Sequence, residues 1–477
     1  MKFLKIIIPM VFIFTAISCS KDFLEPQPTS AVSEEGYFKT DEELESGILN
    51  MYDGIQGTND RSTSSNHSIQ YEFYVTEMRT DNTRGKGAVD SDADQAQFVN
   101  YNIRATNGIV ADYYRSMYNI IYRANVLLDN LGVASDANRA RFEGEAKFVR
   151  AYAYFNLVRL YGDVPLVDKV IAPLDTEISY TRIESSIIYD FIEEDLLSAV
   201  ANLGDGYKNR ASKAAAEALL AKVYLTIGEY SQAQTLCESI MKPARGFSLE
   251  SNFKDVFYNE GNDEVIFAVG YEPDLIKDSQ GFSSEWLNAV GYTAGVNYVT
   301  KEMRDAFDQY GGDRTLYSIR QDVIQPSEYQ VAKYIPNGDE NLGIAPIASD
   351  PRLAGNDWIV LRYADVLLMH VEAILAGAEA TTSSNAIASF QEVRNRAGIT
   401  TTVATITKED LLNERRVELA FENQRFFDLL RLGEAQNVLS AYATENGYNF
   451  TSTTLLLPIP SSEINLSKGL LEQNPGY

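Results

Sequence analysis

Apolar residues recur at helical spacing over most of the patterned part of the chain. This spacing predicts helices at residues 41–54, 111–131, 141–161, 184–203, 211–241, 361–375, 385–396 and 408–432. Within 211–241 two such patterns are separated by a break at Gly228, and Ser212 and Ser231 are placed to cap them. The segment is therefore predicted to form a helical hairpin.

The turn of this hairpin, Gly228-Glu-Tyr230 followed by Ala233, resembles the helix-turn-helix unit of tetratricopeptide repeats. Each such unit buries its apolar face only by stacking on another. One pair of helices in some other all-α domain is the simpler alternative, and the remaining helical segments decide between the two. The periodicity by itself predicts a mainly α fold that contains a helical hairpin.

The segment 141–161 has apolar stripes on two sides, one through Phe142 and Leu157 and a second through Phe148 and Phe155. A helix that is apolar on two sides lies between neighbours, so we expect this helix at the centre of the fold. Gly162 is expected to end it.

Two long stretches, 56–108 and 242–355, lack a sustained period and are rich in Gly, Asp, Asn and Tyr. We expect ordered loops there, because their aromatic residues are too apolar for a solvated coil. Within the second stretch, residues 264–269 predict a strand. Residues 455–477 are predicted to be extended.

The composition argues against several kinds of partner. The chain of 477 residues has a formal net charge of −26, which disfavours binding to nucleic acid or to an anionic membrane surface. Its two cysteines are Cys19 and Cys237. Cys237 fits a small buried residue of the second hairpin helix.

The N-terminus has the order of a secretory signal, with Lys2 and Lys5, an apolar run from 6 to 17, and a small residue directly before Cys19. A transmembrane anchor is the alternative, but the run is short for one. The end of the run resembles the lipobox of bacterial lipoproteins. This resemblance implies a signal peptide at 1–18, lipidation of Cys19, and a polar tether to residue 40.

Five further stretches occur in a fixed order behind this motif: 145–165, 362–368, 414–431, Pro458-Ile-Pro460 and Gln473-Asn-Pro-Gly-Tyr477. Together they resemble the SusD/RagB family of outer-membrane nutrient-binding lipoproteins of Bacteroidetes. The resemblance implies a single, mainly α body, with four tetratricopeptide-like helical hairpins as scaffold and an irregular, loop-rich part that carries the ligand site. It also implies capture of glycans, or of another nutrient such as peptides, at the cell surface for a SusC-like TonB-dependent transporter. The expected parts are a helical part at 41–241, an irregular part at 242–355 and a C-terminal helical part at 356–477.

Several charged and aromatic motifs are predicted to be structural. Leu412, Leu419 and Phe426 repeat every seven residues and predict a buried seam, while the acidic and basic residues Glu422, Arg425, Asp428 and Arg431 are expected to pair along one helix face. Arg362 and Asp365 have the same spacing and the same expected role, and Trp358 is expected to pack in the core.

Two alternatives to nutrient binding remain, a repeat scaffold for protein partners and a glycoside hydrolase. A hydrolase needs two carboxylates across a sugar, one with a raised pKa, and no stretch singles out such a pair. The only histidines are His67 and His370, so neither a zinc site nor a histidine-based triad is expected. No cofactor is expected.

Ligand contacts are predicted on the loops, because aromatic rings and short polar side chains match the faces and hydroxyl edges of sugars. One candidate segment is 281–292, with Trp286 and Tyr292; the other holds Tyr74, Arg79 and Asn82. The alternative for each is an ordinary packing or loop role.

Overall fold

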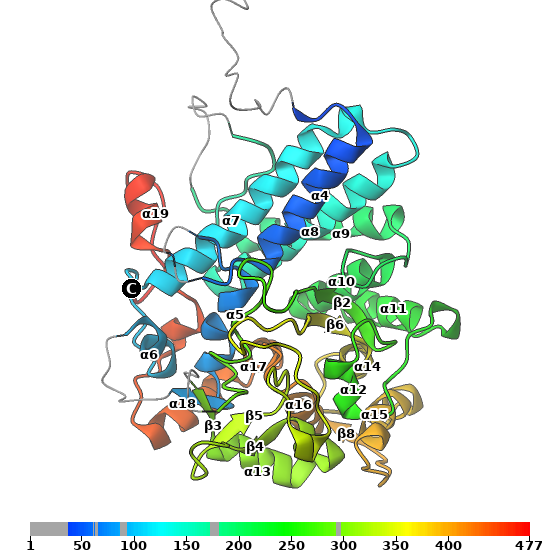
Figure 1. Ribbon diagram of the computed structural model, residues 1–477, viewed down its shortest axis with the longest axis vertical. Helices are drawn as coiled ribbons and strands as arrows, with labels where there is room; N and C mark the ends of the chain where they lie inside the picture. Colours follow the sequence, from blue (N-terminus) through cyan, green and yellow to red (C-terminus); the bar gives the residue numbers. More distant parts are fainter. Residues whose placement is uncertain (1–36, 61, 63–64, 86–92, 172–180, 292–296) are drawn as a thin grey trace, which may run out of the picture.

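The computed structural model describes residues 37–477 except 61, 63–64, 86–92, 172–180 and 292–296 (Figure 1). Most of these residues are in helices, as the sequence predicts. None of the described helices is long and apolar enough to cross a bilayer. The predicted signal peptide, Cys19 and most of the tether lie outside the described residues, and so does Tyr292.

Eight helices form a stack in which each packs against the next (Figure 1). They are α4 (Asp41–Gln56), α7 (Gly108–Asp129), α8 (Arg139–Tyr161), α9 (Ser185–Asn202), α10 (Lys213–Ile227), α11 (Tyr230–Ile240), α14 (Tyr363–Leu375) and α15 (Ser384–Arg396). Such stacking of helical hairpins buries a continuous apolar core, as in repeat proteins. The contact between α11 and α14 joins the predicted N-terminal and C-terminal parts directly.

The hairpin of α10 and α11 follows its sequence signals closely. The Ser212 side chain accepts a hydrogen bond from the amide of Ala215, which caps α10 as predicted. Gly228 has a φ of 82° in the left-handed region that favours glycine. The prediction that Ser231 caps the second helix is wrong: the tight turn places Glu229 at the cap, and α11 already begins at Tyr230. Cys237 is fully buried, as expected.

Helix α8 is the central helix that its two apolar stripes predict. Phe142, Phe148, Phe155 and Leu157 are all buried, and the helix packs against α4, α7 and α9. It ends at Gly162, whose φ is 72°.

The predicted helix at 408–432 is interrupted. It consists of α16 (Lys408–Glu418) and α17 (Arg425–Arg431), and the link between them includes Phe421 and Asn423 at φ of 64° and 60°. Left-handed residues cannot continue a right-handed helix, so the charged residues do not share one face. Only Arg431 and Asp428 pair as predicted, at 2.7 Å, whereas Glu422 and Arg425 find partners elsewhere in the fold. The predicted seam through Leu412, Leu419 and Phe426 is nevertheless buried.

A buried network of ion pairs connects the link between α16 and α17 to β6. Arg362 ends the strand β6 (Trp358–Arg362) rather than lying in a helix, and it therefore does not pair with Asp365. Its guanidinium instead lies 2.6–2.7 Å from the carboxylates of Glu264, Glu418 and Glu422. Buried charges of this kind are tolerated only when each has a partner.

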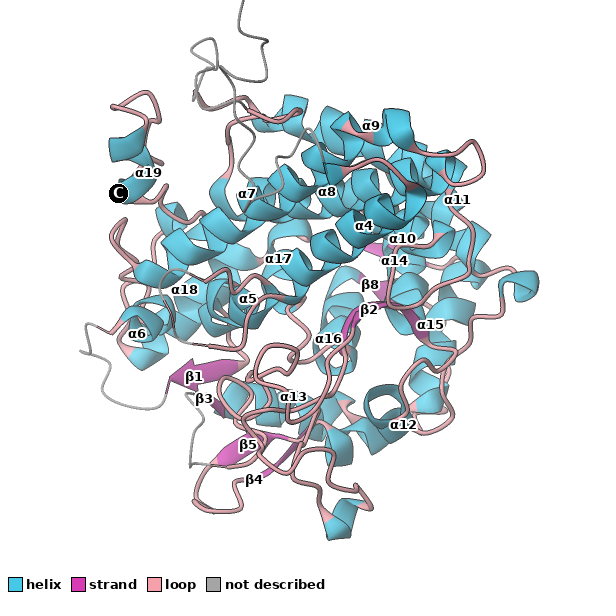
Figure 2. Cartoon of the chain, turned by 45° about the horizontal axis from the view of Figure 1, so that its top comes forward, coloured by secondary structure: helices cyan, strands magenta, loops and turns pink. Residues whose placement is uncertain are grey.

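The strands form four antiparallel pairs among the described residues. They are β1 (Thr83–Gly85) with β3 (Asn297–Val299), β2 (Val265–Val269) with β6, β4 (Ile319–Gln321) with β5 (Tyr329–Val331), and β7 (Ala380–Thr381) with β8 (Ile406–Thr407). The predicted strand at 264–269 is β2. Figure 2 shows β1, β3, β4 and β5 gathered with long loops at the end away from α9.

Shorter helices complete the two loop-rich stretches and the C-terminal part. They are α5 (Ile69–Val75), α6 (Asp94–Val99), α12 (Phe253–Tyr258), α13 (Lys301–Tyr310), α18 (Ala435–Asn446) and α19 (Ser461–Leu466), together with the short 3-10 turn at Glu77–Arg79. The described residues of both loop-rich stretches are therefore ordered, as their aromatic content predicts. Because α19 interrupts the C-terminal stretch, residues 455–477 are only partly extended, contrary to the prediction.

Candidate ligand-binding face

The two loop segments predicted to bind ligand lie against each other. Gln70 of α5 joins them: its carbonyl oxygen accepts a hydrogen bond from Trp286 Nε1 at 2.7 Å, and its side chain bonds the backbone of Ser279 and Gly281. The pairing of β1 with β3 continues the contact. We call this meeting of α5 with residues 279–290 the loop junction.

Trp286 lies inside the loop junction, with 2 % of its surface exposed. Its indole stacks on Phe73 at 4.4 Å and on Phe282 at 4.9 Å, and Trp358 meets it edge-on. These ring contacts and the hydrogen bond to Gln70 fit the packing role that the sequence left open as the alternative for Trp286. Trp358 is buried, as predicted.

Arg79 is also buried, and it links the first loop to the C-terminal part. Its guanidinium donates to the carbonyl groups of Val75 and Thr454 and lies 4.1 Å from the ring centre of Phe426. Burial lowers the pKa of Arg79 to about 10. The Arg79 side chain therefore ties the first loop to the C-terminal part of the fold.

Asn82 and Tyr74 are buried as well. The Asn82 amide donates to Glu77 Oε1 at 2.7 Å and accepts from Arg416 Nε at 2.9 Å. The Tyr74 hydroxyl donates to Glu285 at 3.2 Å, so this pair joins the two predicted segments. A direct role in ligand contact stays a prediction for these residues, as it does for Trp286, Tyr292 and Arg79.

The partly exposed edge of the loop junction carries Tyr71 and Glu285. The Tyr71 ring stacks on His67 at 4.1 Å with the planes almost parallel, and it meets Tyr74 edge-on. Burial alone would lower the pKa of His67, but the hydrogen bonds and negative charges of Asp112, 2.9 Å away, and Asp60 together raise it. This edge thus combines an aromatic ring and a carboxylate, with the buried His67 imidazole stacked beneath the ring.

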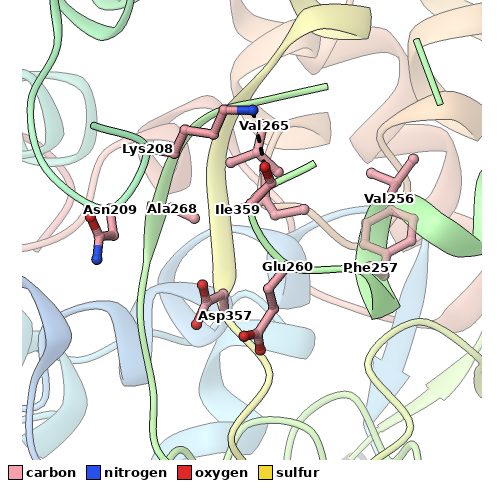
Figure 3. Close-up of a pocket in the computed structure, with 10 residues that line it drawn as sticks. Lys208, Asn209, Val256, Phe257, Glu260, Val265, Ala268, Asp357 and Ile359 are labelled. Atoms are coloured by element: carbon pink, nitrogen blue, oxygen red, sulfur yellow. Dashed lines mark hydrogen bonds between the residues drawn. The ribbon is translucent and has the colours of Figure 1, made fainter. Parts of the chain in front are cut away.

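A separate hollow of about 220 Å³ lies beside the β2–β6 pair (Figure 3). Glu260 and Asp357 lie together at one end of it, and burial and the charge of Glu260 raise the pKa of Asp357 to about 7. Lys208 points away from this pair and donates to the carbonyl groups of Gly261 and Asn262.

Two carboxyl groups, one with a raised pKa, are part of what a glycoside hydrolase needs. The hollow is smaller than the 300 to 1,000 Å³ that is typical of ligand pockets, so it is too small to enclose a glycan chain. What the pair can do directly is to accept hydrogen bonds from a polar ligand. The sequence did not single it out, although Asn259-Glu260-Gly261-Asn262-Asp263 is a visibly acidic, turn-rich stretch.

A second hollow, of about 260 Å³ and lined by tyrosines, was also not predicted from the sequence. Tyr114, Tyr118 and Tyr122 lie along one face of α7 and meet Pro165 and Leu471 there. Their four-residue spacing is the signal that identifies such a face. Within the described part of the chain, no group of three or more His, Cys, Asp or Glu side chains is arranged to hold a metal ion.

Comparisons with known proteins cover nearly the whole chain. A model described as the SusD family matches residues 285–477, and one described as starch-binding associating with outer membrane matches residues 22–225. The SusD-like protein P2 of Formosa agariphila is 26 % identical over 98 % of both chains. The starch-binding protein SusD of Bacteroides thetaiotaomicron is 25 % identical over 76 % of this chain and 78 % of its own.

Solved structures agree with these matches. A laminarin binding SusD-like protein is 27 % identical, with a TM-score of 0.76 over 92 % of this chain and all of its own. The surface glycan-binding protein A of Bacteroides thetaiotaomicron in complex with laminarihexaose is 21 % identical and shares the fold, with a TM-score of 0.75 over 91 % of this chain and 99 % of its own. From the two family matches, the full-length relatives and the shared fold, it follows that this chain belongs to the SusD family.

Proposed function

We propose that this protein is an outer-membrane lipoprotein that binds glycans at the cell surface and delivers them to a SusC-like TonB-dependent transporter. One observation carries the glycan part: the likeness, over 92 % of this chain, to a solved protein whose name states that it binds laminarin. The starch-binding SusD of Bacteroides thetaiotaomicron adds a second relative named for a glycan. Both relatives are named for binding, and the function proposed is binding without catalysis.

The proposed ligand face is the open edge of the loop junction. Tyr71 offers an aromatic ring there and Glu285 a carboxylate, which suit the apolar face and the hydroxyl groups of a sugar. Trp286, Arg79 and Asn82 support this edge from within through the contacts described above. Tyr292 follows the same segment beyond the described residues.

A titration of the full mature protein with glycans tests the binding proposal. Calorimetry would compare laminarin oligosaccharides, maltooligosaccharides and a mixture of peptides, and we expect heat of binding with a glycan. Binding of peptides alone would overturn the glycan assignment in favour of another nutrient. A protein that binds none of these small ligands but captures a protein partner would favour the scaffold alternative.

The position of the face is tested by Tyr71→Ala. Losing one aromatic platform is expected to weaken glycan binding about tenfold, because such contacts contribute on the order of 1 kcal/mol beyond their buried area. Tyr37→Ala is the matched control, since Tyr37 is a tyrosine with 41 % exposure outside the loop junction. Equal affinity of the two variants would place the ligand elsewhere.

Delivery to a transporter rests on the family and on the N-terminal motif ending at Cys19. A lipid on Cys19 would hold the protein at the membrane, where a SusC-like barrel is its expected partner. Purification of the protein from detergent-solubilised envelopes should recover such a barrel with it. Recovery of the free monomer alone, under conditions that preserve other outer-membrane complexes, would contradict this part of the proposal.

A further inference from the structure

A cavity larger than the two hollows above lies in the C-terminal part, away from the open edge of the loop junction. It has a volume of about 660 Å³ and is enclosed by α16, α17, α18, the β7–β8 pair and the segment that contains Asp81. This volume lies within the range of pockets that bind small organic ligands. Its lining includes three basic residues, four acidic residues and one amide: Lys408, Arg416, Arg425, Asp81, Glu379, Glu409, Glu434 and Asn413.

Arg425 lies at this cavity with an unused donor. Its Nε and Nη2 donate to the two carboxylate oxygens of Asp81 at 2.9 and 3.0 Å. Nη1 is buried and has no partner within the described part of the protein, and only 5 % of the residue is exposed. A buried donor without an acceptor costs free energy, so an acceptor that reached Nη1 would be stabilising.

Arg416 lines the same cavity and shares the same aspartate. Its Nε donates to the side chain of Asn82, and its Nη2 lies 2.9 Å from Asp81 Oδ2. Its remaining amino group, Nη1, makes no hydrogen bond to any residue that the structure describes. Two guanidinium groups therefore converge on one carboxylate, and each keeps donors to spare.

Among the described residues, the two arginines are in direct contact with only one carboxylate, although the cavity lining as a whole carries more acidic than basic side chains. Arg416 and Arg425 carry two positive charges, and Asp81 provides one negative charge. The nearby carboxyl of Glu77 is buried, and burial raises its pKa to about 7, so it supplies only part of a second negative charge at neutral pH. At the rim, by contrast, Lys408 lies 3.3 Å from Glu379 and 3.1 Å from Glu434 and is fully paired.

We propose that this cavity binds an organic carboxylate on a hydroxylated ring, such as a hexuronate, with the carboxylate accepting the unused donor of Arg416 beside the positive charge of Arg425. The guanidinium group is the side chain best matched to a planar carboxylate. Asn413 makes no side-chain hydrogen bond to described residues, and its amide is the group available to ring hydroxyls. This site is separate from the proposed glycan face and adds a charged ligand class to the function.

Titration calorimetry of the full mature protein in low-salt buffer tests the proposal with three ligands. D-Glucuronate carries both the ring and the carboxylate, D-glucose only the ring, and acetate only the carboxylate. We expect glucuronate to bind at least about tenfold more tightly than either of the others, since hydrogen bonds to charged groups are the strong ones. Equal affinity for glucuronate and glucose, or no binding of glucuronate, would overturn the proposal. Acetate binding as tightly as glucuronate would overturn the ring specificity.

Two variants locate the site. Arg416→Gln removes the charge and should lower glucuronate affinity about tenfold or more. Because Arg416 also holds Asp81 and Asn82, Asn413→Trp serves as a second variant that fills the cavity from α16 and leaves both arginines unsubstituted. Gln436→Trp, at an exposed position of α18 outside the cavity lining, is the matched control. Full glucuronate affinity in a folded Asn413→Trp protein would refute the site, whereas glycan binding at the loop junction should persist in this variant.

Discussion

Replacing Trp286 by alanine separates a core role from a ligand role. The indole is 2 % exposed, and a buried tryptophan removes about 150 to 250 Å² from water. At about 25 cal/mol per Å² this corresponds to roughly 4 to 6 kcal/mol, as an upper estimate. Tryptophan-to-alanine changes in cores cost about 3 to 5 kcal/mol, and the lost hydrogen bond to Gln70 contributes about 1 kcal/mol of such a loss.

This loss translates into a measurable shift in melting temperature. The unfolding entropy is about 2.1 cal/mol/K per residue, or about 0.9 kcal/mol/K over the roughly 440 residues after the tether. A loss of 3 to 5 kcal/mol therefore lowers the Tm by about 3 to 5 °C, provided that the body unfolds as one unit. Differential scanning calorimetry measures both the shift and the cooperativity.

Trp286→Phe is the matched control for this experiment. It keeps an aromatic ring beside Phe73 and Phe282 and removes the N–H donor, so it should cost less than the alanine variant. An alanine variant that melts within about 1 °C of wild type and has lost glycan binding would refute the packing argument. Trp286 would then be a ligand contact, as the sequence first suggested.

Three further predictions follow from other parts of the molecule. Asp357→Asn tests the raised pKa of this carboxyl group. The wild-type carboxyl binds its proton more tightly in the folded state, so wild-type stability should fall as the pH rises from about 4 to 7. Thermal melts across this range should show a weaker decline for the variant, which should be the more stable protein above pH 7. An unchanged pH profile would mean that the carboxyl is not perturbed. Arg362→Met leaves Glu264, Glu418 and Glu422 without their shared cation and should lower the free energy of unfolding in denaturant by about 3 to 5 kcal/mol. Arg352→Met, at an exposed ion pair, is the control and should leave this free energy unchanged. Cys19→Ala should release the protein from the membrane fraction, and fractionation identical to wild type would exclude lipidation at this residue.

Local patterns determined the helices of this protein. The 3.6-residue period located the helices of the stack, and Ser212 and Gly228 marked the ends of α10 because capping and left-handed turns depend on a few neighbouring residues. The two-sided apolar pattern of α8 also placed that helix at the centre, since a helix without a polar face must be covered on all sides. The family resemblance likewise rested on short motifs that the sequence contains in full.

Tertiary structure alone decided which loop residues are buried and what they contact. Trp286 bonds Gln70 from 216 positions away, and Arg425 bonds Asp81 from 344 positions away, so neither partner is visible in a local window. The interruption between α16 and α17 was likewise not visible in a local window. Glu422, in the link between these helices, pairs with Arg362, which also pairs with the distant Glu264. An aromatic or charged side chain in an irregular loop looks the same in sequence whether it faces a ligand or the core. Its role is fixed by long-range packing, which outweighs local preference wherever a charge or a large ring must be buried with a partner.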